Sequence, residues 1–358
     1  MMVRAFPVKI LASLVSLALL LAACGSPKAS KESPAQQPAQ PAAEAPKSLK
    51  KIKVGYLNVM DDAQAMLAKD AGFYEKHGLD VELVLFGSGT DLIKALVGGH
   101  LQAGVLGFTN ALTWAEKGAD LKIVGGAQMG YHSILVRKGS GIKTVADLKG
   151  KKLASQKQGS TADVVLNGVT FKQAGLTRKD VNFVYVEPDV AIQALAAGQV
   201  DAAFVFEPYE QIARATSDVE AIYEIGKVWP FPCMVVITTG KVLAEDRAAI
   251  DQVLTAQREA IIMMQEQPAE AAKLLTKRFI QADELAGPSG AKVKAVDVIQ
   301  KAIETQMFHW EITPEEIGRM EEVVQIMLEQ GVLKQQVDVK ALLDLTWQQK
   351  VASSHGGH

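Results

Sequence analysis

The stretch DVELVLFGSGTDLIKALVGG at residues 80–99 decides the fold. Its first half is rich in Val and Leu, which favour a strand, and its second half spaces apolar residues three and four apart, as a helix does. The stretch DVNFVYVEPDVAIQALAAG at residues 180–198 repeats this plan, with Asp-Val recurring after 100 residues and Ile-x-Ala-Leu-x-x-Gly after 99. An upstream Ala-Gly pair recurs after 103 residues. We therefore expect two related α/β lobes.

Strand-like runs alternate with helical patterns in the first half of the chain. The runs are residues 51–56, 80–85, 103–106 and 121–124, and the helical patterns are residues 63–77 and 91–98. This alternation is typical of βαβ units, in which helices cover a parallel sheet. The second lobe should begin near Gly139, where residues 151–154 take the place of residues 52–55.

The pattern changes to long helices after about Gly240. The predicted helices are residues 243–267, 268–280, 291–305, 313–330 and 339–350. These helices need a surface on which to pack, and we expect lobe one to provide it. The chain would then cross between the lobes twice.

These crossings define the expected domains. Lobe one should comprise residues 51–135 and 236–350, lobe two residues 136–235, and residues 351–358 should form a disordered tail. Two crossing segments make a hinge, and the cleft between the lobes is the natural ligand site.

The N-terminus is typical of an exported lipoprotein. Arg4 and Lys9 precede an apolar run at residues 10–21, and small residues follow before Cys24. This run is shorter than the roughly 20 residues that span a bilayer. We expect a signal peptide at residues 1–23, lipid on Cys24 and a flexible Pro-rich linker over residues 24–50, which would hold the protein at the outer face of a membrane. An ordinary signal peptide followed by a chance cysteine is the alternative.

Composition excludes several functions. The net charge is −2 and no basic stripe with interleaved aromatic residues occurs, so no nucleic-acid partner is expected. Once Cys24 carries lipid, Cys233 is the only thiol and cannot form an intramolecular disulfide. The common nucleophile, phosphate-loop, dinucleotide and paired-cysteine motifs are missing. We therefore expect neither an enzyme nor a bound metal or cofactor.

A family resemblance rests on motifs in series. The motif GYLNVMD at residues 55–61, followed by AKDAGFYEKHGLDVEL at residues 68–83, resembles the start of the nitrate/sulfonate/taurine-type solute-binding proteins of ABC importers. Further matches lie at residues 86–90, 144–153, 159–160, 194–202 and 206–208. The same superfamily includes proteins that bind the pyrimidine precursor of thiamine. One departure is Gln102, which stands where the family usually has an acid, whereas the second lobe keeps Asp201.

The resemblance implies the fold and the partners. The expected fold is α/β, a periplasmic-binding-protein type II fold with two parallel-sheet lobes, a two-strand hinge and C-terminal helices packed on lobe one. The resemblance also implies a monomer that captures a small polar or anionic ligand for an ABC permease and its ATPase. A thiamine-precursor ligand is the alternative, and a pyrimidine-biosynthesis enzyme of the same fold or a sensor without transport is a further one.

Two strand-to-helix loops are candidates for binding an anionic group. They contain Ser88, Gly89 and Thr90 in lobe one, and Gly159, Ser160 and Thr161 in lobe two. Unpaired N–H groups at a helix start favour an anion. The alternative is that the hydroxyl groups only cap their helices.

Acidic residues indicate a different end of the ligand. Asp61 and Asp62 follow the first strand, and Glu207 follows the strand at residues 202–206. If they enter the cleft, they would disfavour nitrate and favour an amino-sulfonate or an aminopyrimidine. The alternatives are a solvated turn for Asp62 and a helix start for Glu207.

The remaining candidates lie at other strand ends and at the crossings. Amide or hydroxyl groups are offered by Asn58, Thr109, Asn110, Gln128 and Gln156. The crossings contain Tyr131, His132, Trp229 and Cys233. We expect hinge packing for the two aromatic residues, pH sensitivity for the histidine and a small buried role for the cysteine.

Overall fold

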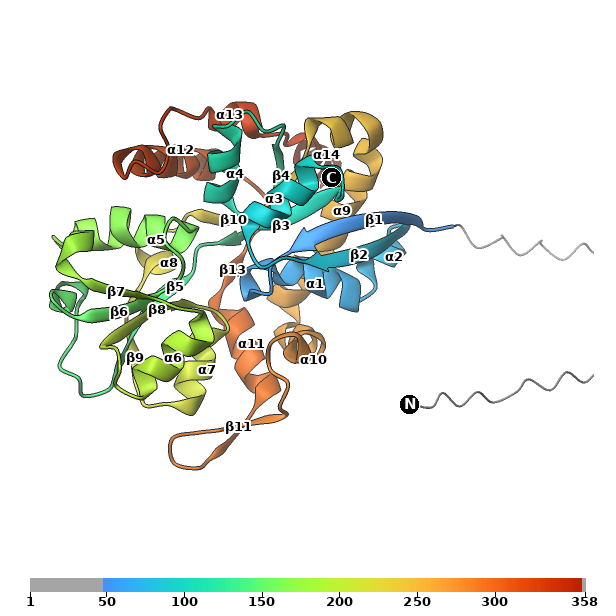
Figure 1. The fold of residues 1–358 in the computed structure, drawn as a ribbon. Coiled ribbons are helices and arrows are strands. Elements are labelled where there is room, and N and C mark those ends of the chain that lie inside the picture. Colours follow the sequence, from blue (N-terminus) through green and yellow to red (C-terminus); the bar gives the residue numbers. More distant parts are fainter. Residues whose placement is uncertain (1–47, 356–358) are drawn as a thin grey trace, which may run out of the picture. The chain divides into compact units, whose positions relative to one another are not determined.

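The computed structural model describes residues 48–355 (Figure 1). The predicted signal peptide, Cys24 and nearly all of the linker lie outside the described residues. No helix within the described range has the length and apolar character needed to cross a membrane.

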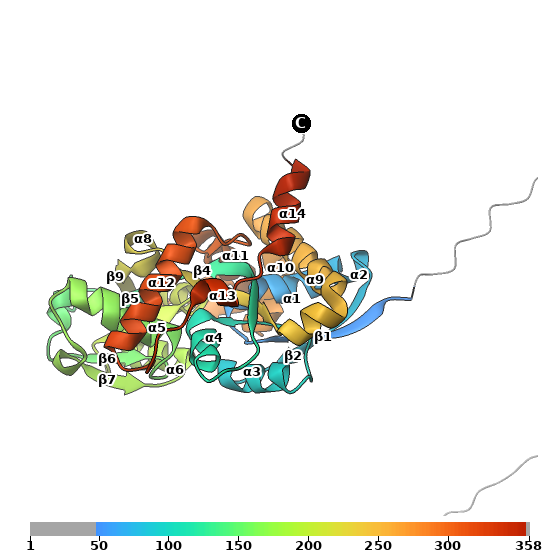
Figure 2. The same cartoon turned by 90° about the horizontal axis from the view of Figure 1, so that it is seen from above.

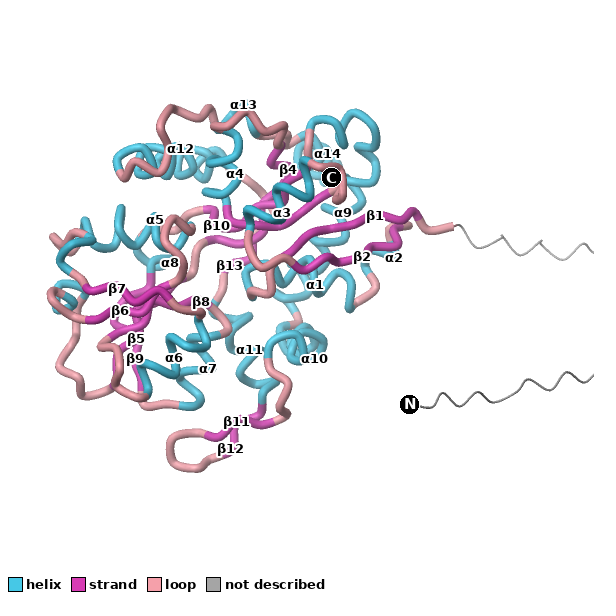
Figure 3. Tube along the Cα trace, viewed as in Figure 1, coloured by secondary structure: helices cyan, strands magenta, loops and turns pink. Residues whose placement is uncertain are grey.

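Two separate mixed sheets form the framework, as the two groups of strands in Figure 3 show. The first has the order β13-β4-β10-β3-β1-β2 and the second the order β7-β6-β8-β5-β9. The strands of the first sheet are β1 (Lys50–Tyr56), β2 (Leu79–Leu85), β3 (Ala103–Gly107), β4 (Lys122–Met129), β10 (Pro232–Thr238) and β13 (Met307–Phe308). Those of the second are β5 (His132–Arg137), β6 (Lys152–Ser155), β7 (Asn182–Tyr185), β8 (Ala202–Phe206) and β9 (Val219–Glu224).

The internal repeat is visible in the strand register. In the first sheet β1 runs parallel to β2 and β3, and in the second sheet β6 runs parallel to β7 and β8. Val54 lies opposite Ala103, and Leu153 lies opposite Ala202, so both partners are displaced by the same 99 residues. The prediction of two related α/β lobes is confirmed.

Gln102 and Asp201 make the same contact in the two sheets. The amide of Lys53 donates to Gln102 Oε1 at 2.8 Å, and the amide of Lys152 donates to Asp201 Oδ2 at 2.8 Å. Each side chain lies just before one strand and accepts a hydrogen bond from the backbone of the neighbouring parallel strand. The departure from the family pattern at Gln102 therefore preserves the hydrogen bond.

Each sheet contains an antiparallel strand that the predicted parallel sheets lacked. β5 is antiparallel to β8 and β9, and β10 is antiparallel to β3 and β4. Both follow a crossing, so they enter their sheet from the carboxyl ends of its parallel strands and run in the opposite direction. The crossings lie at residues 130–131 and 229–231, and the predicted boundaries after residues 135 and 235 fall inside β5 and β10.

Helices cover both faces of the sheets. Those between the strands are η1 (Met60–Asp62), α1 (Ala63–Asp70), α2 (Phe73–Lys76), α3 (Gly89–Val97), α4 (Phe108–Ala115), η2 (Val145–Leu148), α5 (Thr161–Val165), η3 (Leu166–Phe171), η4 (Arg178–Asp180), α6 (Pro188–Ala196), α7 (Tyr209–Thr216) and α8 (Ile225–Val228). Alternation along β3 directs Val105 into the cluster with Met66 and Leu106 into the cluster with Leu92. Both faces of the first sheet are thus buried.

The C-terminal part contains α9 (Gly240–Glu266), α10 (Pro268–Phe279), β11 (Glu284–Ala286), β12 (Lys292–Lys294), α11 (Ala295–Thr305), α12 (Pro314–Glu329), α13 (Val339–Leu342) and α14 (Thr346–His355). As predicted, α9 packs on the first half of the chain, against α1 and α2. Contacts with the helices of the second sheet also occur, because α11 meets α7 and α12 meets α5 (Figure 2).

Three predictions for this C-terminal region were wrong. The helix expected at residues 339–350 is interrupted because Leu343 bridges to Ile123 of β4 and the Asp344 amide donates to the Ile123 carbonyl at 2.9 Å. Residues 351–355, expected in a disordered tail, continue α14. The helix expected from residue 291 begins at Ala295, after the β11–β12 hairpin.

Candidate functional site

The two crossings run past the carboxyl ends of the parallel strands. His132 lies opposite Phe206 at the end of β8, and Met234 lies opposite Gly107 at the end of β3. The crevice at this edge of an α/β sheet is the usual place for a ligand. The crossings therefore bring His132 and Cys233 to the edge where ligands bind in such sheets.

The crossing segments contact each other directly. The Gly130 amide donates to the Phe231 carbonyl at 2.7 Å, and a Cβ atom on Gly130 would lie 2.0 Å from the Phe231 ring. Trp229 packs against Phe231 with tilted rings and centroids 5.5 Å apart, and the Arg319 guanidinium lies 4.4 Å from the Trp229 ring centroid. Tyr131 is buried beside them. The two aromatic residues expected at the hinge thus pack at the crossings.

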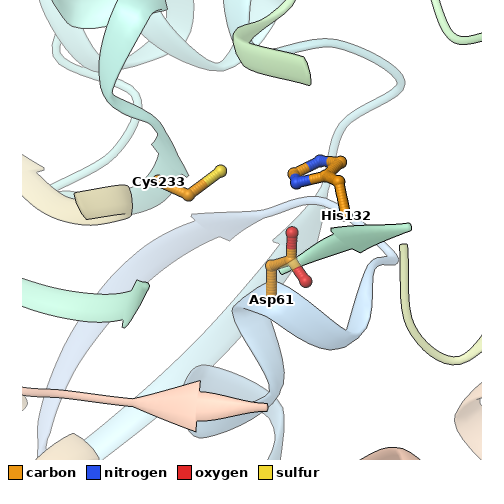
Figure 4. Close-up of side chains that lie close together, drawn as sticks. All are labelled: Asp61, His132 and Cys233. Carbon is orange, nitrogen blue, oxygen red and sulfur yellow. The ribbon is translucent and has the colours of Figure 1, made fainter. Parts of the chain in front are cut away.

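Asp61, His132 and Cys233 come together although they are far apart in sequence (Figure 4). One carboxylate oxygen, one ring nitrogen and the sulfur all lie within 4.8 Å of one another. The three side chains are 4%, 3% and 2% exposed. Asp61 comes from η1 after β1, His132 begins β5, and Cys233 lies at a register irregularity between Pro232 and Met234 of β10. Such irregularities re-aim side chains near functional sites.

Burial controls the protonation of this cluster. It raises the pKa of Asp61 to about 7, although the amide of Gln306, which donates to Asp61 Oδ1 at 3.1 Å, acts in the opposite direction. Burial also raises the pKa of the Cys233 thiol well above its usual value and lowers that of His132 to about 4. At neutral pH the imidazole is therefore neutral and the thiol protonated.

Asp62 is the second buried acid of η1. Its Oδ2 accepts a hydrogen bond from the Leu57 amide at 2.8 Å. Burial raises the pKa of Asp62 well above the usual range, and the neighbouring Asp61 carboxylate adds to this shift. Asp62 is therefore a turn residue with a buried, not a solvated, carboxyl group.

Several buried polar atoms without a protein partner lie at or just after the ends of strands. Among the described residues they include Asp62 Oδ1, His132 Nδ1, Gln156 Oε1 and both amide atoms of Gln128. A buried polar group left unsatisfied costs about 1–3 kcal/mol, so native proteins retain few of them without a reason. Recognition of a ligand is such a reason.

Other residues with buried, unpartnered polar atoms were missed in the sequence, and three of them bear on this site. They are Gln64 with both amide atoms, Ser155 with its hydroxyl and Gln306 with Oε1. Ser155 ends β6, so the rule that nominated Gln156 could have found it. Gln306 reaches Asp61 across 245 residues, and no local signal indicates that contact.

The start of α5 faces the start of α4. Thr109 Oγ1 and Thr161 Oγ1 form a hydrogen bond of 2.7 Å, and a Cβ atom on Gly107 would lie 2.7 Å from Thr161 Oγ1. The loop before α3 lies beside this contact, because a Cβ atom on Gly89 would lie 3.0 Å from the Asn110 amide.

Ser88 and Ser160 cap their helices. Ser88 Oγ accepts from the Asp91 amide at 3.2 Å, and Ser160 Oγ accepts from the Asp163 amide at 3.3 Å. Thr90 and Gly159 are half-buried, and the Gly159 amide donates to Asp163 Oδ2 at 2.8 Å. Capping is thus observed, and ligand contact stays a prediction for both loops. Hydrogen bonds with Ser88 and Lys94 lower the pKa of Asp91, and the charge of Lys157, a residue that sequence reasoning missed, adds a small effect in the same direction, so Lys157 lies near the α3 start.

Glu207 joins two helices. It is fully buried, and it accepts hydrogen bonds from the Gln211 amide at 3.2 Å, Gln211 Nε2 at 2.9 Å and Thr305 Oγ1 at 2.8 Å. Burial, reinforced by Glu210, raises the pKa of Glu207 to about 8. Asn58 is exposed and donates to the Arg278 carbonyl at 3.3 Å. The hydrogen bonds of Glu207 and Asn58 are therefore made with other segments and not with the Asp61, His132 and Cys233 cluster.

Comparison with solved structures supports this description of the fold. The crystal structure of a periplasmic aliphatic sulphonate-binding protein from Escherichia coli superposes with a TM-score of 0.68 at 25% identity, covering 82% of this chain and 97% of that chain. The two-lobed architecture is thus the periplasmic-binding-protein fold, as predicted.

Sequence comparisons agree. A putative aliphatic sulfonates-binding protein of Bacillus subtilis is 25% identical over 351 residues, 96% of each chain. A putative binding protein of Brucella abortus is 27% identical over 241 residues, covering 65% of this chain and 72% of its own. The family model described as NMT1/THI5 like matches residues 60–271, more than half of the chain. The chain therefore belongs to the NMT1/THI5-like family.

Proposed function

We propose that this protein is the solute-binding component of an ABC importer, which closes two lobes on a small polar organic ligand. The observation that carries the proposal is the set of buried, unpartnered polar atoms at the strand ends of both sheets, including Gln128 in the first and Gln156 in the second. Because each sheet contributes, a ligand that satisfies these atoms favours the closed arrangement by its difference in affinity between the two states.

The crossings at residues 130–131 and 229–231 serve as the hinge of this motion. Gly130 and Phe231 hold the two segments together, so the lobes rotate about a paired connection rather than about two independent linkers. The relevant bodies are the two sheets with the helices packed on them. The protein acts as a monomer, with the permease and its ATPase as partners.

The ligand class follows from the donors and acids together. Relatives are named for sulfonates, whose oxygens suit unpartnered hydroxyl and amide donors such as those of Ser155 and Gln128. The neighbouring buried acids, Asp61 and Asp62, would gain from an amine a positive partner that favours their ionised forms, and a simple anion such as nitrate offers none. An amino-sulfonate of the taurine kind satisfies both requirements. The same acids also favour the amino group of a thiamine-precursor pyrimidine, which is the second candidate.

A thermal-shift screen tests this function. The purified protein is heated with taurine, alkanesulfonates, nitrate, bicarbonate or hydroxymethyl-aminopyrimidine, because a bound ligand stabilises the native state by about 2.7 kcal/mol at 100 times its dissociation constant. We expect taurine or a short alkanesulfonate to raise Tm by several degrees and nitrate to leave it unchanged. The same mixtures are analysed for products, because turnover of any compound would contradict a binding protein without catalysis.

Export and lipid attachment at Cys24 complete the proposal. A receptor tethered by a Pro-rich linker stays near its permease on the outer side of the membrane and can still move. Labelled palmitate should enter the wild-type protein in cells and not Cys24→Ser. Incorporation into both proteins would contradict the anchor.

A further inference from the structure

We propose that Asp61, His132 and Cys233 form a binding site for one thiophilic divalent metal ion, of which Zn²⁺ is the best match. The residues come from η1, the first position of β5 and the irregularity in β10, so folding is required to assemble them. The three residues are far apart in the sequence, so no local spacing motif predicts the site. The inference does not depend on which solute is transported, but a bound ion would occupy Asp61 and leave Asp62 as the acid available to an amine of the solute.

The geometry suits a tetrahedral ion. Ligand atoms around tetrahedral Zn²⁺ lie about 3.3 to 3.6 Å apart, because Zn–S bonds are about 2.3 Å and Zn–N and Zn–O bonds about 2.0–2.1 Å. The three candidate atoms already lie within 4.8 Å of one another. Small side-chain rotations would bring them to bonding distance. Figure 4 shows the thiol and the carboxylate directed toward the imidazole.

The donor set selects the metal. A thiolate and an imidazole favour Zn²⁺ and similar borderline ions, whereas Mg²⁺ and Ca²⁺ prefer oxygen ligands alone. Thiolate and carboxylate together balance the charge of a divalent cation, and coordination of the Cys233 thiol releases its proton to solvent. Three protein ligands leave a fourth position for water or another small ligand, as in open zinc sites.

Independent observations support a ligand at this point. His132 Nδ1 is buried and has no hydrogen-bond partner among the described residues. The ring is held in place by Phe204, stacked at 5.4 Å between centroids, and by the edge of Phe206 at 5.8 Å. Gln306 donates to Asp61 Oδ1 at 3.1 Å, and such outer contacts orient carboxylate ligands in metal sites.

A catalytic triad does not fit the same residues. In a triad the carboxylate and the thiol contact different ring nitrogens, which places oxygen and sulfur about 7 Å apart when each lies ~3 Å from its nitrogen. Here the oxygen and the sulfur lie within 4.8 Å of each other. Three ligand atoms that all point toward one position are arranged as the ligands of a metal ion are.

The site would link both crossings to the first sheet. His132 follows one crossing directly and Cys233 lies two residues after the other, while Asp61 follows β1. A bound ion would therefore add a link from Asp61 to both crossings, which are already joined by the Gly130–Phe231 hydrogen bond, and would restrict the relative motion of the two sheets.

The experiment uses Co²⁺ as a spectroscopic probe and Zn²⁺ as its competitor. The full chain carries Cys24→Ser, which leaves Cys233 as its only thiol, together with His355→Ala and His358→Ala, which remove the histidines of the last four residues. After treatment with a chelator, we expect this protein to bind one equivalent of Co²⁺ with a thiolate-to-metal charge-transfer band, and one equivalent of Zn²⁺ to abolish the band.

Single variants in the same background test the ligands. Cys233→Ala should lose the band and weaken Zn²⁺ binding at least about 100-fold, and His132→Gln should weaken it similarly while the apo protein melts as a folded domain. Exposed His100→Gln is the matched control and should change neither. Unchanged Zn²⁺ affinity in Cys233→Ala, or a background protein that binds no equivalent of metal, overturns the proposal. Cys233→Ala decides the question if His132→Gln fails to fold, because it only shortens a small side chain.

Discussion

Thr109 Oγ1 lies 2.7 Å from Thr161 Oγ1, so one hydroxyl at the start of α4 is hydrogen-bonded to one at the start of α5. The two helices follow β3 of the first sheet and β6 of the second. The bond therefore joins the two lobes directly, and it exists only when their strand ends face each other.

Removing this bond should favour the open arrangement. Thr109→Val keeps the side-chain shape and loses a hydrogen bond worth about 0.5–1.5 kcal/mol, which corresponds to roughly 2- to 10-fold weaker solute binding. Calorimetry gives the affinity, and X-ray scattering without solute should show a larger radius of gyration. Thr113→Val is the control, because Thr113 Oγ1 donates to the Thr109 carbonyl within α4. Fully additive losses in Thr109→Val/Thr161→Val would contradict a direct coupling.

The side-chain amide of Gln128, near the carboxyl end of β4, should weaken stability and strengthen solute binding. Both its side-chain amide atoms are buried without a partner among the described residues, so Gln128→Met should raise the free energy of unfolding of the solute-free protein by about 1–3 kcal/mol. The same variant should bind solute at least about 10-fold more weakly, because the apolar side chain makes no hydrogen bond. Urea unfolding and calorimetry measure the two effects. Exposed Gln173→Met should change neither, and a Gln128→Met protein with full affinity would remove this residue from the site.

The fold was largely predictable because its signals are local. Strand and helix periodicities in residues 80–99 and their repeat indicated two α/β lobes, and the equal registers of β1 with β3 and β6 with β8 confirm this. The antiparallel direction of β5 and β10 was not predictable in the same way. It depends on the end of the sheet at which the chain arrives after each crossing. That end is set by contacts between residues far apart in the sequence.

The site was predictable residue by residue but not as an assembly. Asp61, His132 and Cys233 were each nominated from their places at strand ends or crossings. Their convergence depends on the pairing of β10 with β4 and of β5 with β8, which no local pattern encodes. Gln306 was missed for the same reason, since its only clue is a contact with Asp61.

Glu207 should make stability depend on pH. Its pKa is about 8 in the folded protein against a usual value of 4.5, so between these values the unfolded chain has lost a proton that the folded protein retains. Stability therefore falls as pH rises from about 5 to 8, by a few kcal/mol at most. Glu207→Gln cannot lose a proton, so its unfolding free energy should decline less over this range. Urea unfolding at several pH values measures the unfolding free energy of both proteins. Other titrating groups contribute equally to the two proteins, so the difference between the profiles reports on Glu207.

The matched control for this pH dependence is Glu220→Gln, which changes an exposed glutamate of β9. Its profile should follow that of the wild type. Parallel profiles for wild type and Glu207→Gln would show that Glu207 keeps an ordinary affinity for its proton when the protein folds.

Gly130 is required where the two crossings touch. A Cβ atom would lie 2.0 Å from the Phe231 ring, so Gly130→Ala should lower the free energy of unfolding by about 3 kcal/mol through overpacking. Gly318→Ala, within α12 and with no atom near the new methyl group, should instead raise it by up to about 1 kcal/mol. Shortening the ring should relieve the clash, so Gly130→Ala/Phe231→Ala should be destabilised by less than the sum of the two single variants. An additive double variant would mean that Gly130 is needed for a reason other than its approach to Phe231.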